Sequence, residues 1–185
     1  MSIFSNLTKI NLTGNDISEA YPNDISNEAT EIFLAGNNFV GQVNFIPSSI
    51  IHYNVDNNDL EGSLPGLSST NIKTCNVANN NFSGNVPNLS GCTSLVKFIA
   101  NDNSFTGVAQ NFLVGDSLIY LDLSDNNLSS GAIDRILGAL VEAGANNGYV
   151  DLTGSNNGTR SATTGAGYVT TLTSPSRGWT VHVNT

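Results

Sequence analysis

Charged side chains are scarce in this sequence, and basic ones are the scarcest. Only 11% of its 185 residues are charged, with 6 Lys and Arg against 15 Asp and Glu, which gives a formal net charge of −9. Soluble proteins carry about 25% charged residues on average. So few cations argue against a nucleic-acid ligand, whose phosphates need them, and against attraction to anionic lipid surfaces.

Cysteine and long apolar runs are also nearly absent. Cys75 and Cys92 are the only cysteines, which excludes a disulfide framework and favours a protein made in a reducing compartment. No apolar run reaches the roughly 18 residues that a membrane-spanning helix needs. The first residues show neither the basic start nor the apolar stretch of a secretory signal, so we expect no export by that route.

Residue types suited to catalysis are few. His52 and His182 are the only histidines, and the chain separates them widely. The sequence contains no zinc-ligand spacing, no phosphate-binding glycine loop, no dinucleotide fingerprint and no nucleophile beside a base. We therefore predict that the protein is not an enzyme and that it uses no cofactor and no metal.

Asparagine is abundant instead, with 28 copies, and much of it is periodic. Six segments carry apolar residues at their first, fourth, sixth and eleventh positions and asparagine at the ninth; the fourth segment reads IKTCNVANNNF, from Ile72. Successive ninth positions lie 22, 21, 22, 23 and 23 residues apart. The ninth-position asparagines are Asn15, Asn37, Asn58, Asn80, Asn103 and Asn126.

The repeat has a physical meaning. Positions four and six are separated by one residue, so both side chains leave the same face of a short strand. Stacked copies then form a parallel sheet with one buried face, and the turn after each strand leaves backbone groups without partners. The ninth-position asparagine offers one acceptor and two donor hydrogens. We expect these amides to point inward and to bridge the turns of neighbouring coils as a buried column.

The pattern resembles the leucine-rich repeat family, L-x-x-L-x-L-x-x-N-x-L, over residues 7–152. The stretches EGSLP and SGNVP also resemble the convex-side motif of plant-type members. The resemblance implies an α/β solenoid: a right-handed coil with a parallel β-sheet on its concave face, an irregular or 3₁₀ convex side and one or two C-terminal helices. Residues 131–148 have helical spacing of apolar residues, and Gly144 suits the helix end.

We expect a single domain over residues 1–185. Residues 1–6 form a thin N-terminal cap, residues 7–154 form about seven repeats, and residues 155–185 form a C-terminal cap with a final strand. In the seventh, degenerate repeat, Ser155 replaces the expected asparagine.

Both ends of a solenoid need to be covered. Tyr168, Leu172 and Trp179 could cover the C-terminal end, whereas only Ile3 and Phe4 could shield the first coil. We infer that a partner covers the N-terminal edge, and a frayed first coil is the alternative.

The outward-facing strand positions define a candidate contact surface in the C-terminal half of the predicted sheet. Exposed aromatic and aliphatic side chains in one patch are typical of contact surfaces. The alternative is that the C-terminal cap or an adjoining subunit covers them. The candidate residues are Val96, Ile99, Ile119, Tyr120, Tyr149, Asp122 and Asp151.

Two of these residues could support other chemistry. Asp122 and Asp151 fall on neighbouring strands, about 5 Å apart. Such carboxylates can bind Ca²⁺ or act as a glycosidase pair. The closely spaced ligands of a calcium loop are missing, so a solvated acidic face is the favoured interpretation.

The sequence favours recognition over chemistry, because a solenoid presents an extended surface. The first hypothesis is a phage virion protein, for capsid decoration or attachment, made in the host cytoplasm and bound to a virion protein or to itself at the N-terminal edge. The stretch GWTV, from Gly178, resembles endings of some bacterial and phage leucine-rich repeat proteins. The alternative is a bacterial surface or secreted protein that binds a host protein or glycan. A carbohydrate-active enzyme is a third hypothesis, which rests on the aspartates alone.

Overall fold

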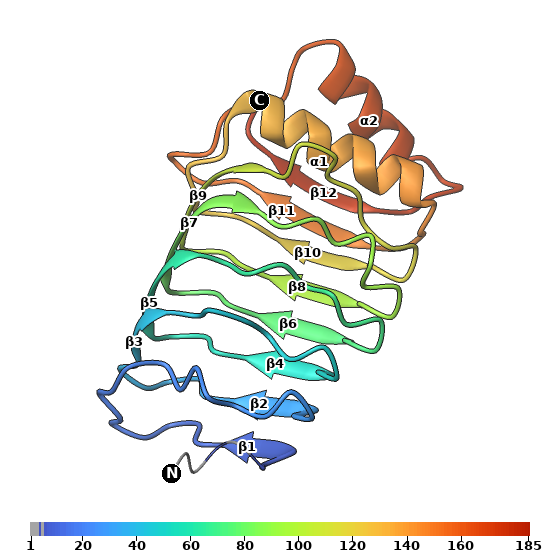
Figure 1. The fold of residues 1–185 in the computed structure, drawn as a ribbon. Helices are drawn as coiled ribbons and strands as arrows, with labels where there is room; N and C mark the ends of the chain where they lie inside the picture. The colour runs from blue at the N-terminus through green and yellow to red at the C-terminus, as the bar shows by residue number, and fades with distance from the viewer. Residues whose placement is uncertain (1–3, 5) are drawn as a thin grey trace.

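The structure, a computed structural model, describes residue 4 and residues 6–185. Ile3, which was expected to shield the first coil, lies outside the described residues. The chain winds through coils that stack along one axis (Figure 1), and each coil adds a strand to a parallel sheet. The predicted solenoid is confirmed.

The larger sheet has eight strands, which pair in parallel and in register. The same repeat position therefore stacks from coil to coil: Tyr120 pairs with Lys97 on one side and with Tyr149 on the other. In spatial order its strands are β1 (Lys9–Asn11), β2 (Glu31–Phe33), β4 (His52–Asn54), β6 (Thr74–Asn76), β8 (Lys97–Ile99), β10 (Tyr120–Asp122), β11 (Tyr149–Leu152) and β12 (Thr180–Val183).

A second parallel sheet of four strands, which the pattern did not predict, lies on the return side of the coils (Figure 1). Gly41, Gly62 and Gly84 within its strands have φ of 83°, 80° and 77°. Only glycine adopts this backbone without strain, and glycines read as turns in a sequence. The strands are β3 (Val40–Gln42), β5 (Asp59–Ser63), β7 (Asn81–Val86) and β9 (Ser104–Val108).

Two helices close the C-terminal end (Figure 1). The helix α1 (Ser130–Ala143) begins after Ser129, whose Oγ accepts a hydrogen bond from the Ala132 N–H at 3.2 Å, and ends at Gly144 as predicted. The helix α2 (Thr164–Leu172) follows β11 and packs against α1. Within the part of the chain that the structure describes, neither helix is long and apolar enough to span a membrane.

One hydrophobic core runs the length of the solenoid. The fourth repeat position faces inward in every coil. From the second coil onward the fourth-position side chains are fully buried, as are the mid-strand residues Leu60, Phe82 and Phe105 of the second sheet. These fourth-position side chains are Ile32, Tyr53, Cys75, Phe98, Leu121 and Val150.

A column of asparagine amides joins successive coils. Asn80 is buried; its Nδ2 donates to the Val55 carbonyl of the preceding coil at 3.0 Å, and its Oδ1 accepts from the Leu60 N–H at 3.0 Å. Equivalent bonds are made by Asn37, Asn58, Asn103 and Asn126.

The two ends of this column differ from the expectation. Asn15 is exposed and donates only to Leu12 and Thr13 of its own coil, because no coil precedes it in the described chain. In the last repeat the column does not stop at Ser155, which is exposed. Asn157 takes the place instead, donating to the Leu123 carbonyl at 3.0 Å and accepting from the Leu128 N–H at 2.9 Å. Because the turn of the last repeat has two extra residues, its asparagine lies at residue 157 and not at residue 155, where the repeat spacing predicts it.

The eighth repeat position, just before the column, has a left-handed backbone in each of the first six repeats. Glycine, asparagine and aspartate adopt this conformation most readily, so the turn accounts for Asn57 and Asn79. The residues and their φ values are Gly14 (70°), Gly36 (65°), Asn57 (53°), Asn79 (51°), Asp102 (51°) and Asp125 (49°).

The C-terminal cap is a packed structure. Leu172 and Trp179 are buried, and the Trp179 indole N–H donates to the Ala145 carbonyl at 2.8 Å. The Arg177 guanidinium donates to the carbonyls of Leu140 and Val141 at 3.0 and 3.3 Å, where the helix dipole of α1 is negative. Tyr168 of α2 packs against the same core.

Candidate binding surface

The candidate residues come together on the outer face of the eight-stranded sheet, over β8, β10 and β11. Ile119 is 41% exposed and the others are partly exposed, so the patch is open to solvent. We call these residues, Val96, Ile99, Ile119, Tyr120, Asp122, Tyr149 and Asp151, the tyrosine patch. Of the cap helices, α1 contacts α2 and β9, and α2 also contacts β12.

Two stacked rings form the centre of the tyrosine patch. The Tyr120 and Tyr149 rings are 5.0 Å apart at their centroids and 18° from parallel, because the register places them side by side on neighbouring strands. Lys97 Nζ lies 5.6 Å from the Tyr120 centroid, and the His182 ring meets Tyr149 edge-on at 5.4 Å. Stacking and the cation–π contact hold the rings in one arrangement.

Both aspartates serve as local turn acceptors. Asp122 Oδ1 accepts from the N–H and hydroxyl of Ser124 at 3.1 and 2.7 Å, and Asp151 Oδ1 accepts the same pair from Thr153 at 3.0 and 2.7 Å. Their surroundings then diverge. Asp151 Oδ2 also accepts from the Tyr149 hydroxyl at 2.9 Å and lies 3.5 Å from His182 Nδ1.

The surroundings of the two carboxyl groups shift their pKa values in opposite directions. Burial raises the pKa of Asp122; the bonds from Ser124 oppose this, and the charges of Asp151 and Asp102 add to it. Burial also acts to raise the pKa of Asp151, but the donors on Thr153 and Tyr149 and the nearby His182 outweigh it and leave that pKa lowered. Burial, followed by the bond to Asp151, raises the pKa of Tyr149 to about 12.

The sequence interpretation omitted Lys97 and His182 from the candidate patch. Their positions were readable from the repeat, because Lys97 occupies the third position beside Tyr120 and His182 the fifth position beside Asp151. The sequence gives no sign of which side chains touch. The structure shows that Lys97 lies over the Tyr120 ring and that the His182 ring contacts Tyr149.

The N-terminal half of the same face has smaller, separate contacts. Lys9 pairs with Glu31 at 2.8 Å, and Phe33 stacks on His52 at 6.5 Å. His52 Nδ1 lies 2.8 Å from the Thr74 hydroxyl.

Metal-ligating and thiol side chains are the next feature of the described residues. Among residue 4 and residues 6–185, no three His, Cys, Asp or Glu side chains are placed to hold a metal ion. Cys75 and Cys92 are buried, and burial raises the pKa of Cys92 to about 11, which keeps that thiol protonated near neutral pH.

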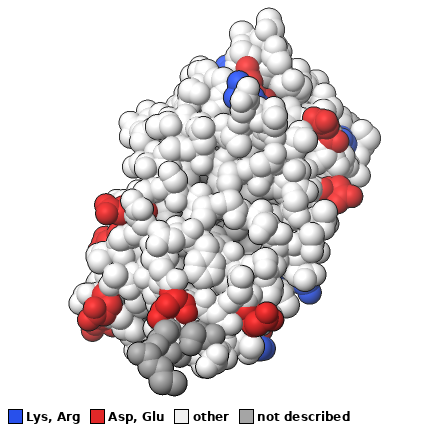
Figure 2. Space-filling model, viewed as in Figure 1, with Lys and Arg blue, Asp and Glu red and all other residues white. Residues whose placement is uncertain are grey.

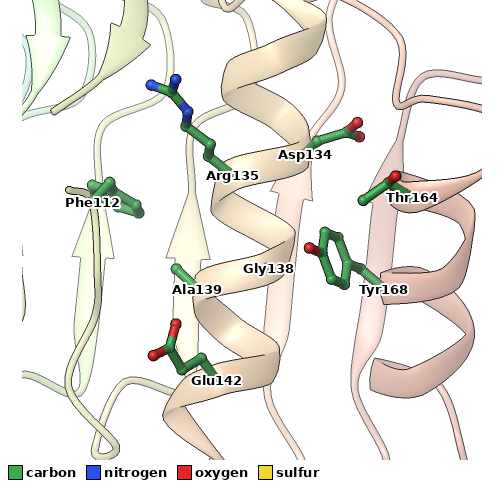
Figure 3. A pocket seen from close by; sticks show the side chains of 8 residues that line it. All are labelled: Phe112, Asp134, Arg135, Gly138, Ala139, Glu142, Thr164 and Tyr168. Carbon is green, nitrogen blue, oxygen red and sulfur yellow. The ribbon is translucent and has the colours of Figure 1, made fainter. Parts of the chain in front are cut away.

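Hollows also lie away from the tyrosine patch. A groove of about 380 Å³ runs over α1, and Figure 3 shows Tyr168 pointing to Gly138 from one flank while Arg135 and Glu142 lie on the other. Its polar groups therefore do not converge on one point. An apolar hollow of about 350 Å³ at the N-terminal end includes Leu12, Ile17 and Phe39.

The fold is a solenoid that presents the outer face of a parallel sheet. Its repeat belongs to a known family: the family described as Leucine Rich Repeat matches residues 6–27 and 117–140. The chain is a leucine-rich repeat protein.

Similar solved structures come from plant receptors. A plant peptide hormone receptor, RGFR1 in complex with RGF2, has a TM-score of 0.62 and 26% identity, over 80% of this chain and 25% of that one. The ectodomain of the Arabidopsis thaliana receptor kinase GASSHO1/SCHENGEN3, in complex with CASPARIAN STRIP INTEGRITY FACTOR 2, has a TM-score of 0.46 and 20% identity, over 68% of this chain and 19% of that one. This chain therefore spans about a quarter of the first receptor chain and about a fifth of the second. No curated protein sequence matches it significantly.

Proposed function

We propose that this chain is a non-enzymatic interaction module that binds a segment of another protein across the tyrosine patch. The observation that carries the proposal is the stacked pair of Tyr120 and Tyr149 on an open sheet face. Rigid aromatic side chains bury a large area at a small entropic cost. Figure 2 shows that charged side chains are sparse on one face of the molecule, in line with a charged fraction of 11%. The similar RGFR1 structure is itself a complex with RGF2.

A library of short random peptides, displayed and selected against the immobilised protein, tests this proposal. We expect enriched peptides whose binding falls at least tenfold when Tyr120 and Tyr149 are both changed to Ser, since the loss of a central aromatic anchor costs about 2 kcal/mol or more. Val40→Ser is the matched control, because it removes an exposed apolar side chain, 45% accessible, from the other sheet. Equal binding by the double variant, or no enrichment at all, would refute the proposal.

The biological setting stays a separate proposal. Attachment to a phage virion, as a decorating or attachment protein, is supported by the GWTV stretch at Gly178. A bacterial surface protein that binds a host protein or glycan is the alternative, supported by the same resemblance. Capsid or tail genes beside the coding sequence, and co-purification with virions, would favour the first; secretion genes would favour the second.

Self-association is a second candidate function, and the apolar hollow near Leu12, Ile17 and Phe39 favours it. Two N-terminal ends that meet would cover this surface. Light scattering over a concentration series should then show dimers, and Ile17→Asp should abolish them without loss of the folded state. A wild-type protein that stays monomeric throughout would rule this candidate out.

A further inference from the structure

Asp122 sits inside the tyrosine patch without a counter-charge. Its neighbours in register are Ile99 and Asp151, and Tyr120 precedes it by two residues on the same face of β10. The ion pairs among the described residues are Lys9 with Glu31 and His182 with Asp151, so none involves Asp122.

One oxygen of Asp122 remains available. Oδ1 takes both bonds from Ser124, whereas Oδ2 accepts no hydrogen bond from the described residues and reaches solvent. Asp151, at the same position of the next coil, differs because Tyr149 and His182 engage its Oδ2. The two carboxylates are alike in the turn and unlike on the surface.

The fold does not require the negative charge at this position. Asn54 and Asn76 occupy the same fifth position in earlier coils, and each Oδ1 accepts the same bond, from the N–H two residues on, at 3.1 Å. After β4 and β6 an uncharged amide therefore accepts the hydrogen bond of the turn. The charge on Asp122 brings a desolvation cost and has no counter-charge among the described residues, so a ligand cation would offset that cost.

The surroundings define what kind of cation fits. Both faces of the Tyr120 ring are already covered, since it lies between Tyr149 and Lys97, and the His182 ring contacts Tyr149. An arriving cation must therefore meet the carboxylate rather than a ring face. Ile99, partly exposed beside Asp122, offers apolar surface for a methylene chain, and long basic side chains bury such stems on apolar surface.

We propose that the tyrosine patch recognises a basic side chain of an extended protein segment, with Asp122 Oδ2 accepting from the ammonium or guanidinium group and Ile99 contacting its methylene stem. This inference rests on the proposed function and names the partner's chemistry. The net charge of −9 favours the approach of such a segment at low ionic strength.

Two capped amino acids test the site directly. Acetyl-arginine amide and acetyl-citrulline amide have closely similar shapes, and only the first is charged. In NMR titrations the arginine compound should give saturable shifts at Tyr120, Asp122 and Ser124 and bind roughly tenfold more tightly than the citrulline compound, as expected for a charge-assisted hydrogen bond. Equal affinity for the two compounds in the wild-type protein would overturn the inference, whatever any variant does.

Substitutions then locate the contact. Asp122→Asn keeps the turn acceptor and should remove the preference for arginine. Asp59→Asn is the control, because Asp59 is exposed on β5 of the other sheet and the net charge changes equally. Lys97→Met should strengthen arginine binding by removing a like charge. An unchanged preference in Asp122→Asn, or an equal loss in Asp59→Asn, would contradict the assigned contact.

The peptide selection separates this inference from the proposed function. Enriched peptides that depend on Tyr120 and Tyr149 and carry a basic residue more often than the starting library support both. Tyrosine-dependent peptides without that bias leave the proposed function standing and refute the basic-residue inference. The absence of enriched peptides refutes both.

Discussion

The two halves of the eight-stranded sheet have the same buried asparagine contacts but different residues on the outer face of the sheet. Inside, Asn37, Asn58 and Asn80 of one half make the same bonds as Asn103 and Asn126 of the other. Outside, the fifth position reads Asn11, Phe33, Asn54 and Asn76 in the first half, then Ile99, Asp122, Asp151 and His182 in the second.

This difference separates what the fold needs from what it permits. Five of the turns after these strands use a fifth-position side-chain acceptor, and asparagine supplies it in β1, β4 and β6 without charge. Two carboxylates beside two tyrosines are an addition that the solenoid does not require. Like charges directly opposite each other destabilise a sheet. We infer that the two aspartates serve the outer face of the sheet and not the stability of the fold.

The largest expected effect concerns the support of the second half. Trp179→Ala should lower the free energy of unfolding by about 3–5 kcal/mol, because it empties a buried indole site and leaves the Ala145 carbonyl unpaired. Urea denaturation gives the loss, and hydrogen exchange should show lower protection in β11 and β12 than in β2 and β4. Thr180→Ala, at an exposed neighbour, is the control. A uniform loss of protection along all strands would show that the halves are not separable.

The next effect tests whether the interior is the same in both halves. Asn80→Leu and Asn126→Leu should each cost about 1–3 kcal/mol, since each strands a buried N–H and carbonyl groups of the turns. Asn15→Leu should change stability by less than about 0.5 kcal/mol, because Asn15 is exposed. Thermal and urea unfolding measure all three. An Asn80 variant as stable as the wild type would show that the amide column does not stabilise the fold.

Much of the fold was predictable because one pattern recurs. Apolar positions four and six, with asparagine at nine, predict the strands and their register, and the apolar spacing of residues 131–148 predicts the helix that ends at Gly144. The second sheet was not predictable, since Gly62 and Gly84 read as turns, yet both lie in paired strands with a positive φ. Asn157 was missed because two inserted residues shift it beyond the period.

The candidate surface was predictable only as a list of outward positions. Register alone puts Tyr120 beside Tyr149 and Asp122 beside Asp151. It does not say that one carboxylate engages Tyr149 and His182 and that the other keeps a free oxygen. Those contacts depend on side-chain conformations, which the repeat pattern does not encode.

The smallest expected effect is the sharpest, because it predicts opposite signs for two like residues. The pKa of Asp122 is raised in the folded protein, so its ionisation weakens the fold as pH rises through its titration. Asp122→Asn should therefore be slightly stabilising at neutral pH, and the gain should disappear in acid. The pKa of Asp151 is lowered, so its contribution exists above the unfolded pKa and is lost as pH falls.

Asp151→Asn should accordingly be destabilising at neutral pH and nearly neutral in acid. Both changes should stay below about 1 kcal/mol, the range of partly exposed charge interactions. Urea midpoints at neutral and acidic pH measure the two differences, and carbon NMR of the carboxyl groups should show Asp122 protonating at higher pH than Asp151. The same sign for both variants at neutral pH would mean that the contacts of Tyr149 and His182 do not distinguish the two coils. The carboxylate assigned to the ligand would then be no more available than its neighbour.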